Sequence, residues 1–266
     1  MEWGKIKTIL IFIFVIVNLF LFIMFFKSEY VDNVIGDELV ENTVKILEDN
    51  NVLIDKSVIP KTHDSVRICT VENKYSSISD MLKTIWTICA ENDVTYFNEK
   101  NTDIHENYFV CTVDKVEEVS NITKYAKREI EKTGLLENAE YVIEEDGEYV
   151  YFYLKFGNKI FYDSYIKVRA TKTGIKEIYG YNWLGDIAFE GGISQTVSPV
   201  EIIIDFTLAN NFQNTVEIES VKSGYYIGER GDTVRVTASP VWEISLNDGQ
   251  VFYYDMRNGD LLKHIK

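Results

Sequence analysis

The longest hydrophobic segment of the chain is residues 9–26, in which seventeen of eighteen positions are apolar and Asn18 is the exception. At about 1.5 Å rise per residue, a helix of this length spans roughly 27 Å, close to the hydrocarbon core of a bilayer. A cleaved signal peptide is the alternative, but its apolar region is usually shorter and ends in small residues. Here the segment ends in Phe25, Phe26 and Lys27, so the pattern predicts a retained transmembrane helix.

Charges on either side of this segment predict its orientation. Lys5 and Lys7 precede it, whereas Lys27 is followed by an acidic stretch. Because cytoplasmic flanks carry an excess of Lys and Arg, residues 1–8 are expected as a cytoplasmic tail and the C-terminal body as extracellular. Trp3 is expected at the level of the lipid headgroups, where an indole ring is favoured.

Asn18 is the residue of the apolar segment whose side chain needs a hydrogen-bond partner. Its amide can bond across a helix pair, for about 0.6–2 kcal/mol, or can reach a backbone carbonyl of its own helix, and the sequence favours neither. No small residues are present in the segment to let two helices approach closely. Association with another membrane helix is therefore expected to use bulky side chains such as Phe22 together with Asn18.

Beyond this segment, periodic hydrophobic positions predict an α+β body. In residues 27–114, a membrane-proximal helix begins near Asp37 and a second helix follows Ser77, while strand patterns occupy residues 66–71 and 108–113. Acidic residues at a helix start and a serine cap support both helices. We treat residues 27–114 as one region of mixed helix and strand.

Residues 115–190 have a clearer layout. An amphipathic helix is expected to end at Gly134, because glycine readily adopts the left-handed conformation that terminates helices. Its apolar positions are Val116, Val119, Ile122, Tyr125, Ala126 and Ile130. Four β-rich segments separated by turn signals follow near residues 140–145, 148–156, 159–170 and 175–183. The simplest assembly is an antiparallel meander packed on the helix.

Residues 191–266 repeat this layout. Ser198 and Glu201 match a capping box, with a proline at the first helical position, so a helix is expected to start there. Strand candidates follow at residues 215–227, 233–246, 250–255 and around Leu261. Turn dipeptides between the later candidates support antiparallel pairing.

The two layouts suggest a duplicated unit. Gly174 and Gly259, each two residues after a basic residue, lie 85 residues apart, a spacing that suits a small domain rather than a solenoid repeat. Unrelated hairpins also carry turn glycines after polar residues, so both interpretations stay open. We expect a single N-terminal transmembrane helix followed by two similar subdomains, each an antiparallel sheet with a packed helix.

Charge divides the chain in the same way as hydropathy. The sequence has 27 Lys and Arg against 42 Asp and Glu, a net charge of −15. Residues 1–27 contain three lysines and one glutamate, a net charge of +2, which leaves −17 on residues 28–266. Such an acidic body is repelled by phosphate backbones, so no nucleic-acid partner is expected.

Side chains that usually carry catalysis or bind metals are scarce. The chain has three histidines, and Cys69, Cys89 and Cys111 are too widely spaced for a CxxC ligand pair. Residues 191–195 do not match the GxSxG pattern of a serine nucleophile, and no phosphate-binding glycine loop is present. No catalytic, metal or cofactor site is therefore predicted, and a hydrolase using Asp and Glu pairs is the least favoured class.

Tyrosine is unusually frequent, with 17 residues in the chain. Tyr149, Tyr151 and Tyr153 alternate along one predicted strand and therefore share a face of the sheet. Such a face packs a thin sheet against its helix or, in a binding module, contacts a peptide or sugar. The sequence leaves both interpretations open.

Both ends of the chain carry distinctive short motifs. The N-terminal end contains Met1-Glu2-Trp3, Lys5, Lys7-Thr8-Ile9 and Asn18-Leu19-Phe20-Leu21. The C-terminal end contains Pro240-Val241-Trp242-Glu243-Ile244, Asp248-Gly249, Tyr253-Tyr254-Asp255 and Asn258-Gly259. Both sets of motifs resemble those of YycI-type proteins of low-GC Gram-positive bacteria. The C-terminal strand pattern is also similar to PepSY-like modules, whereas residues 50–115 align with nothing in the family.

The resemblance implies a bitopic accessory protein of a WalK/YycG-type sensor histidine kinase. In the family, the transmembrane helix and a companion, YycH, contact the kinase's membrane helices and adjust its activity, and thereby cell-wall metabolism, without enzymatic activity. We therefore expect a membrane-anchored, extracytoplasmic regulator of two-component signal transduction whose anchor and partner contacts are Trp3, Lys5, Lys7, Asn18 and Phe22. Activation and repression of the kinase both stay open. The alternative is an anchored extracytoplasmic binding module for a peptide or cell-wall polymer.

Overall fold

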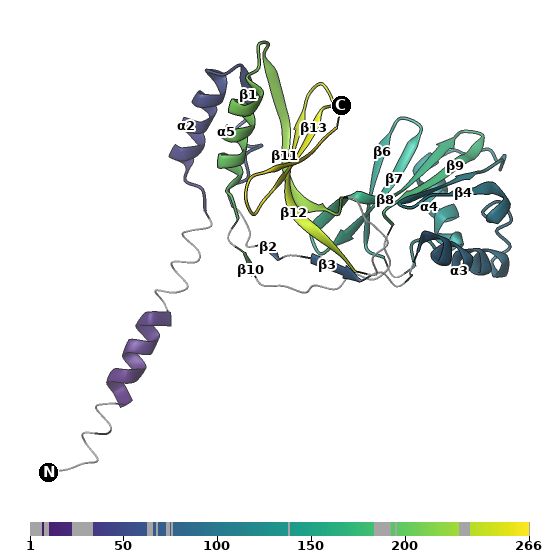
Figure 1. Ribbon diagram of the computed structural model, residues 1–266, viewed down its shortest axis with the longest axis horizontal. Coiled ribbons are helices and arrows are strands. Elements are labelled where there is room, and N and C mark those ends of the chain that lie inside the picture. The colour runs from purple at the N-terminus through teal and green to yellow at the C-terminus, as the bar shows by residue number, and fades with distance from the viewer. Residues whose placement is uncertain are drawn as a thin grey trace.

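The computed structural model describes residues 7, 11–22, 34–62, 66–67, 69–72, 75, 77–137, 139–183, 193–194, 196–228 and 235–265. The fold is α+β, as the sequence predicts (Figure 1). Residues 11–22 are helical. The helices that follow are α2 (Asp37–Glu48), α3 (Ile78–Glu91), α4 (Ile122–Thr133), α5 (Pro199–Asn210) and the short 3₁₀ helix η1 (Glu99–Asn101).

The strands form two groups that meet at one junction. The C-terminal sheet contains β1 (Val52–Ile54), β3 (Cys69–Glu72), β11 (Val216–Tyr226), β12 (Arg235–Leu246), β13 (Val251–Asp255) and β14 (Leu261–Ile265). The middle sheet contains β4 (Thr102–Ile104), β5 (Tyr108–Thr112), β6 (Tyr141–Asp146), β7 (Tyr149–Phe156), β8 (Lys159–Thr171) and β9 (Gly174–Tyr181). A separate two-stranded ribbon pairs β2 (Val66–Arg67) with β10 (Ile193–Ser194).

Most strand pairs in both sheets are antiparallel. The middle sheet has the order β6, β7, β8, β9, β5, β4, and all its neighbours are antiparallel. The C-terminal sheet has the order β1, β11, β12, β13, β14. In this series of described strands, β1 runs parallel to β11, and the other neighbours are antiparallel. Thus α4 precedes the meander β6–β9, and α5 precedes the meander β11–β14.

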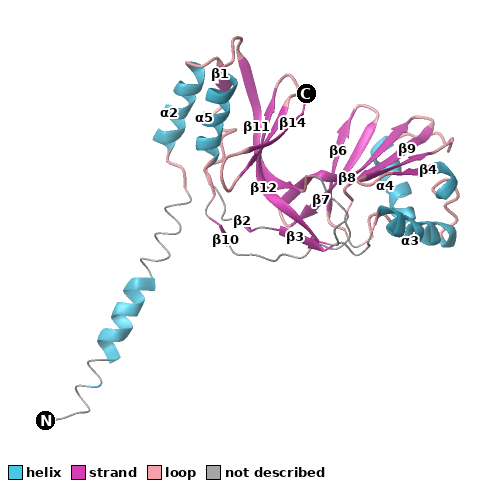
Figure 2. Cartoon of the chain, in the orientation of Figure 1, coloured by secondary structure: helices cyan, strands magenta, loops and turns pink. Residues whose placement is uncertain are grey.

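Each sheet has its own pair of helices. α3 contacts α4, which packs on β8, whereas α2 contacts α5 and β1. Figure 2 shows these two helix pairs at opposite ends of the body, with the strands between them. Residues 27–114, which the sequence presented as one region, therefore contribute to both sheets. α2 and β1 join the C-terminal sheet, β3 pairs with β12, and α3, β4 and β5 join the middle sheet.

The predicted helix starts and stops agree with the structure, except at the start of α4. Ser77 and Ser198 each accept a hydrogen bond from the backbone N–H three residues later, as N-cap serines do. Gly134 ends α4 with a φ of 78°, which confirms its predicted role.

The predicted inclusion of Val116 and Val119 in α4 is wrong. Asn121 caps the helix by accepting a hydrogen bond from the Lys124 N–H at 2.7 Å. The Val119 N–H instead donates to the Lys172 carbonyl at 2.9 Å, and Val116 is 75% exposed. The segment before α4 is therefore extended along the turn between β8 and β9, because its backbone groups find partners there.

The tyrosines of β7 lie on the face of the middle sheet opposite its helices. Val150, Phe152 and Leu154 are buried, and Phe152 contacts Tyr141, whose ring and hydroxyl also meet the side chains of α4. Tyr149, Tyr151 and Tyr153 alternate with these residues and are half-buried. They therefore do not pack the sheet against α4, and they form part of a face on which none of the described helices packs, here called the helix-free face.

The two sheets meet where β8 passes the end of β11. Tyr225 pairs in parallel with Phe161, and their rings stack with centroids 5.1 Å apart. The buried Asp163 carboxylate then accepts hydrogen bonds from the backbone N–H groups of Ile227 and Gly228, at 2.8 and 2.7 Å. Burial raises the pKa of Asp163 to about 6 despite these bonds. The junction is thus a packed and hydrogen-bonded contact between strands distant in sequence.

Candidate functional site

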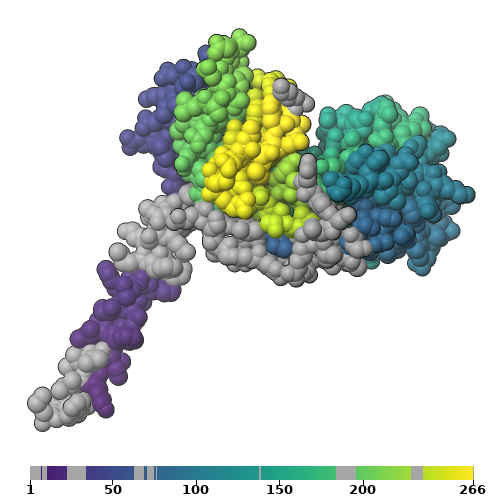
Figure 3. Space-filling model, in the orientation of Figure 1, coloured from purple at the N-terminus to yellow at the C-terminus, as the bar shows by residue number. Residues whose placement is uncertain are grey.

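The predicted anchor and partner contacts lie in or near the helix at residues 11–22. Every residue of this helix is exposed, including Phe14 at 67% (Figure 3). Lys7 and Phe22 are also exposed, whereas Trp3 and Lys5 lie outside the described residues. Exposed apolar surface of this extent is unfavourable in water and marks an interaction site or membrane contact.

The side chain of Asn18 has a partner within its own helix. Its Nδ2 donates to the Phe14 carbonyl oxygen at 2.9 Å, four residues earlier. Of the two interpretations that the sequence left open, the structure thus contains the bond to the helix backbone. One bond does not use the full capacity of an amide, which has a second N–H and an acceptor oxygen.

The described part of the hydrophobic segment is shorter than a bilayer-spanning helix. No helix among the described residues has the length and hydrophobicity needed to cross a membrane. The transmembrane assignment of residues 9–26 therefore stays a prediction from the sequence.

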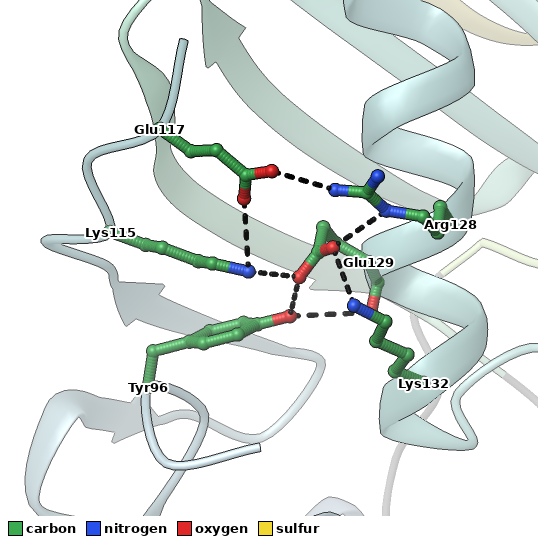
Figure 4. Close-up of polar contacts among 6 residues, drawn as sticks. All are labelled: Tyr96, Lys115, Glu117, Arg128, Glu129 and Lys132. Carbon is green, nitrogen blue, oxygen red and sulfur yellow. Dashed lines mark hydrogen bonds and ion pairs between the residues drawn. The ribbon is translucent and has the colours of Figure 1, made fainter. Parts of the chain in front are cut away.

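A buried charge network joins Glu129 of α4 to four neighbouring polar side chains. Glu129 is fully buried, and its carboxylate accepts hydrogen bonds from Lys115, Arg128, Lys132 and Tyr96 (Figure 4). Glu117 forms the outer part of the network, 3.2 Å from Arg128 and 3.5 Å from Lys115. Burial by itself raises the pKa of Glu129. The hydrogen bonds from its partners have the larger combined effect, and they lower the pKa from 4.5 to about 2.

This network ties α4 to segments on either side of β5. Tyr96 precedes β5 and Lys115 follows it, so the carboxylate of Glu129 holds three parts of the chain together. Sequence reasoning missed Glu129, although a signal was present. Glu129 stands three residues after Ala126 and four after Tyr125, on the apolar stripe of the helix. A charge on that stripe must be buried and paired.

A groove of about 630 Å³ runs beside this network, along α4 and the segment that precedes it. Its lining includes Lys124, Lys127 and Arg128, together with Glu117 and Glu131. Glu117 pairs with Arg128 and Glu131 lies 3.7 Å from Lys127, so much of the charge in the groove is already compensated. The network's hydrogen bonds and ion pairs join α4 to the neighbouring segments of the middle sheet.

None of the cysteine thiols in the described residues is accessible to solvent. Cys69, Cys89 and Cys111 are buried free thiols, and burial raises the pKa of Cys69 and of Cys89 to about 12. Since the thiolate is the reactive form, these side chains are inert packing groups. No group of three or more His, Cys, Asp or Glu in the described residues could hold a metal ion.

The helix-free face of the middle sheet gathers seven tyrosines from four strands, and we call it the tyrosine face. Its members are Tyr108, Tyr149, Tyr151, Tyr153, Tyr165, Tyr179 and Tyr181. Their rings pack edge to face or stacked, for example Tyr153 and Tyr165 at 5.5 Å. Lys167 lies among them, with its Nζ 4.9 Å from the Tyr149 ring centre and 4.8 Å from that of Tyr179. Tyrosine-rich surfaces of this kind are typical of binding sites.

Comparison with known proteins identifies the family. A model of the YycI protein family matches residues 33–255. The chain belongs to the YycI family. Membership confirms the family that the sequence resembles, although the match leaves out residues 1–32, where the N-terminal resemblance lies. The match also includes residues 50–115, which showed no resemblance to the family by sequence alone. It implies a regulator of the YycG (WalK) sensor-kinase system.

The other comparisons are less informative for this YycI-family chain. No curated protein sequence matches it. Among solved structures, the crystal structure of an uncharacterized protein from Eubacterium rectale is similar over 85% of this chain and 99% of its own chain, with 8% sequence identity and a TM-score of 0.44. A similarity of that degree supports no conclusion about function.

Proposed function

We propose that this YycI-family chain is a single-pass, membrane-anchored regulator of a YycG/WalK-type sensor histidine kinase. Residues 9–26 cross the membrane, residues 1–8 are cytoplasmic, and the two sheets lie outside the cell. The hydrophobic helix contacts the membrane helices of the kinase, together with a YycH-like companion, and changes the kinase's activity and thereby cell-wall metabolism. No catalytic role is proposed for the chain.

The observation that carries this proposal is the apolar helix at residues 11–22, in which every residue is exposed. The family regulates a membrane-bound kinase. A helix with an apolar surface of this kind is stable in contact with lipid or with another membrane helix. Because the Asn18 amide bonds Phe14, insertion does not leave that N–H unsatisfied in hydrocarbon. The specificity of the helix contact then comes from bulky side chains such as Phe22. The second N–H and the side-chain oxygen of Asn18 also contribute to it.

Replacing residues 9–26 by an unrelated apolar helix of equal length tests the proposal. The variant is expected to insert in the membrane with the same orientation but to lose regulation of the kinase, measured by a reporter of the kinase's target genes. A matched variant that changes only Glu217→Gln, an exposed side chain of the body, leaves the helix intact and is expected to regulate normally. Full regulation by the replaced helix would contradict action through helix contacts.

The tyrosine face favours a second candidate, an anchored extracytoplasmic module that binds a peptide or cell-wall polymer. In that case the sheets, rather than the helix, carry the specific contacts. Titration of the full chain in detergent micelles with soluble cell-wall fragments separates the two functions. Saturable binding that is lost on changing Tyr151→Ala, in a protein with the replaced helix, would support the module.

A further inference from the structure

The rings of the tyrosine face stand in rows that cross the strands. Strand register places Tyr153, Tyr165, Tyr181 and Tyr108 opposite one another on the neighbouring strands β7, β8, β9 and β5. The ring centres along this first row are 5.5 Å apart between Tyr153 and Tyr165, and 5.8 Å apart between Tyr165 and Tyr181. The face therefore carries an aromatic track that runs perpendicular to the strands.

A second row runs beside the first and contains a lysine. Tyr151, Lys167 and Tyr179 are opposite one another on β7, β8 and β9. The ring of Tyr151 lies 5.5 Å from that of Tyr153, and the ring of Tyr179 lies 6.1 Å from that of Tyr165, so the two rows are in contact. Together they form one aromatic surface with a cation at the centre of the second row.

Lys167 has aromatic neighbours but forms no ion pair within the described residues. Its Nζ lies 4.9 Å from the ring centre of Tyr149 and 4.8 Å from that of Tyr179, and the side chain is half-buried. By contrast, Arg169, two residues later on β8, pairs with Glu148 at 3.0 Å. Tyrosine rings attract an ammonium group without neutralising its charge. An anionic group that reaches this face therefore meets an uncompensated positive charge at Lys167.

The spacing of the rings distinguishes a glycan from a polypeptide as the ligand. An extended polypeptide presents side chains to one surface about every 6.8 Å, which exceeds the steps of 5.5 and 5.8 Å between rings of the first row. One pyranose unit of an extended glycan is close to the ring step in length. Its apolar face packs on an aromatic ring, and tyrosine hydroxyls are hydrogen-bond partners for its hydroxyl groups.

The charge of the body limits the kind of glycan. The net charge of −17 on residues 28–266 repels densely charged polyanions. Glu144, opposite Tyr151, and Glu177, opposite Arg169, add negative charge to the same face. A single lysine among neutral rings is therefore matched by an isolated carboxylate and not by a run of them.

We propose that the tyrosine face binds an extended pyranose glycan that lies across the strands, along the first row of rings, with the carboxylate of one sugar at Lys167. The rings contact the apolar faces of the sugars, and the tyrosine hydroxyls bond the sugar hydroxyls. This inference concerns the middle sheet alone and holds whether or not the N-terminal helix regulates a kinase. Its failure would therefore leave the proposed function unaffected.

The test uses the full-length chain in detergent micelles and isothermal titration calorimetry with two glycans. Hyaluronan hexasaccharide and peptide-free peptidoglycan strands both carry a carboxylate on alternate pyranose units. The chain is expected to bind both saturably. It is expected to bind the methyl ester of the hyaluronan hexasaccharide, which lacks the charge, at least fivefold more weakly. Absence of binding to both glycans would overturn the proposal.

Two substitutions separate the role of the cation from that of the rings. Lys167→Met keeps the apolar stem and removes the charge, so this variant is expected to bind the acid and the methyl ester with equal affinity. Tyr165→Leu removes a ring from the first row and is expected to bind both forms at least fivefold more weakly than the wild type does. An unchanged preference for the acid in Lys167→Met would overturn the placement of the carboxylate.

Lys124→Met is the matched control, since it removes one exposed lysine from α4, which packs on the other face of the middle sheet. It is expected to bind like the wild type. An equal loss of affinity in Lys124→Met, or equally tight binding of densely sulfated heparin, would show attraction to charge in general and contradict the site. Tighter binding of a blocked peptide of alternating leucine and glutamate would assign the face to a polypeptide and overturn the proposal.

Tyr165→Phe separates binding from folding, because it keeps the ring and removes only the hydroxyl. It is expected to bind the hexasaccharide within about twofold of the wild type, whereas Tyr165→Leu is not. Titrations are carried out below the unfolding temperature of each variant, measured in parallel, so that the compared proteins are folded. Wild-type affinity in Tyr165→Leu, or an equal loss in Tyr165→Phe, would contradict contact through the ring.

Discussion

The ring of Tyr162 and the carbonyl of Ile160 pack directly against Gly224, so closely that a Cβ on residue 224 would overlap both. Gly224 lies on β11 and Tyr162 on β8, so this contact sets how near the two sheets approach. A glycine is required here for space, since its φ is not in the left-handed region.

Gly224→Ala is expected to destabilise the protein by about 1–3 kcal/mol, because overpacking forces strands to shift. Denaturant unfolding of the wild type and the variant measures the change. The double variant Gly224→Ala with Tyr162→Ala makes room for the added methyl group, so its two effects should be less than additive. Strict additivity would show that Tyr162 is not what crowds residue 224.

Glu129→Gln is expected to destabilise the fold by about 3 kcal/mol. The substitution removes the buried negative charge and leaves the three cations around it without their ion-pair partner. Glu131→Gln, an exposed neighbour on the same helix, is the control and is expected to have a small effect. Comparable losses of unfolding free energy in the two variants would contradict the account of the network.

The pH dependence of stability gives a second test of Glu129. Its pKa in the folded protein, about 2, lies below its ordinary value of 4.5, so its contribution is complete above pH 4.5. The contribution is lost as the pH falls from 4.5 towards 2. The difference in unfolding free energy between wild type and Glu129→Gln should therefore shrink over this window. A constant difference would contradict the lowered pKa.

Ser198→Ala is expected to destabilise the protein by about 1 kcal/mol, because the Glu201 N–H loses its side-chain acceptor. Ser198→Asp keeps an acceptor near the positive end of the helix dipole and is expected to restore stability. Thermal unfolding checks both variants, and equal losses would show that the cap has no effect.

Local features of the fold could be predicted from the sequence because their causes are local. Ser77 and Ser198 cap helices through neighbouring backbone groups, and Gly134 terminates a helix by its own conformation. The strands of both meanders follow from alternating apolar positions and turn glycines. By contrast, Val116 and Val119 fit a helical spacing but are held extended by the turn after β8.

The rest depends on contacts between distant segments, which local pattern does not encode. β1 pairs in parallel with β11, which lies more than 150 residues later in the chain. This pairing places α2 beside the C-terminal sheet. The junction of Tyr225 with Phe161 and the ring contact of Tyr162 with Tyr253 arise in the same way. The tyrosines of β7 were visible in the sequence, but their partners on β5, β8 and β9 became apparent only in the folded sheet.

The central claim, that the chain regulates a sensor kinase through helix contacts, is tested most directly by photo-crosslinking in living cells. A crosslinking amino acid is placed at position 18, with position 53 as control, because Leu53 is exposed on β1 of the body. The account predicts capture of a sensor histidine kinase from position 18 and not from position 53. Capture from position 53 alone, or no kinase from position 18 in cells where regulation persists, would contradict it.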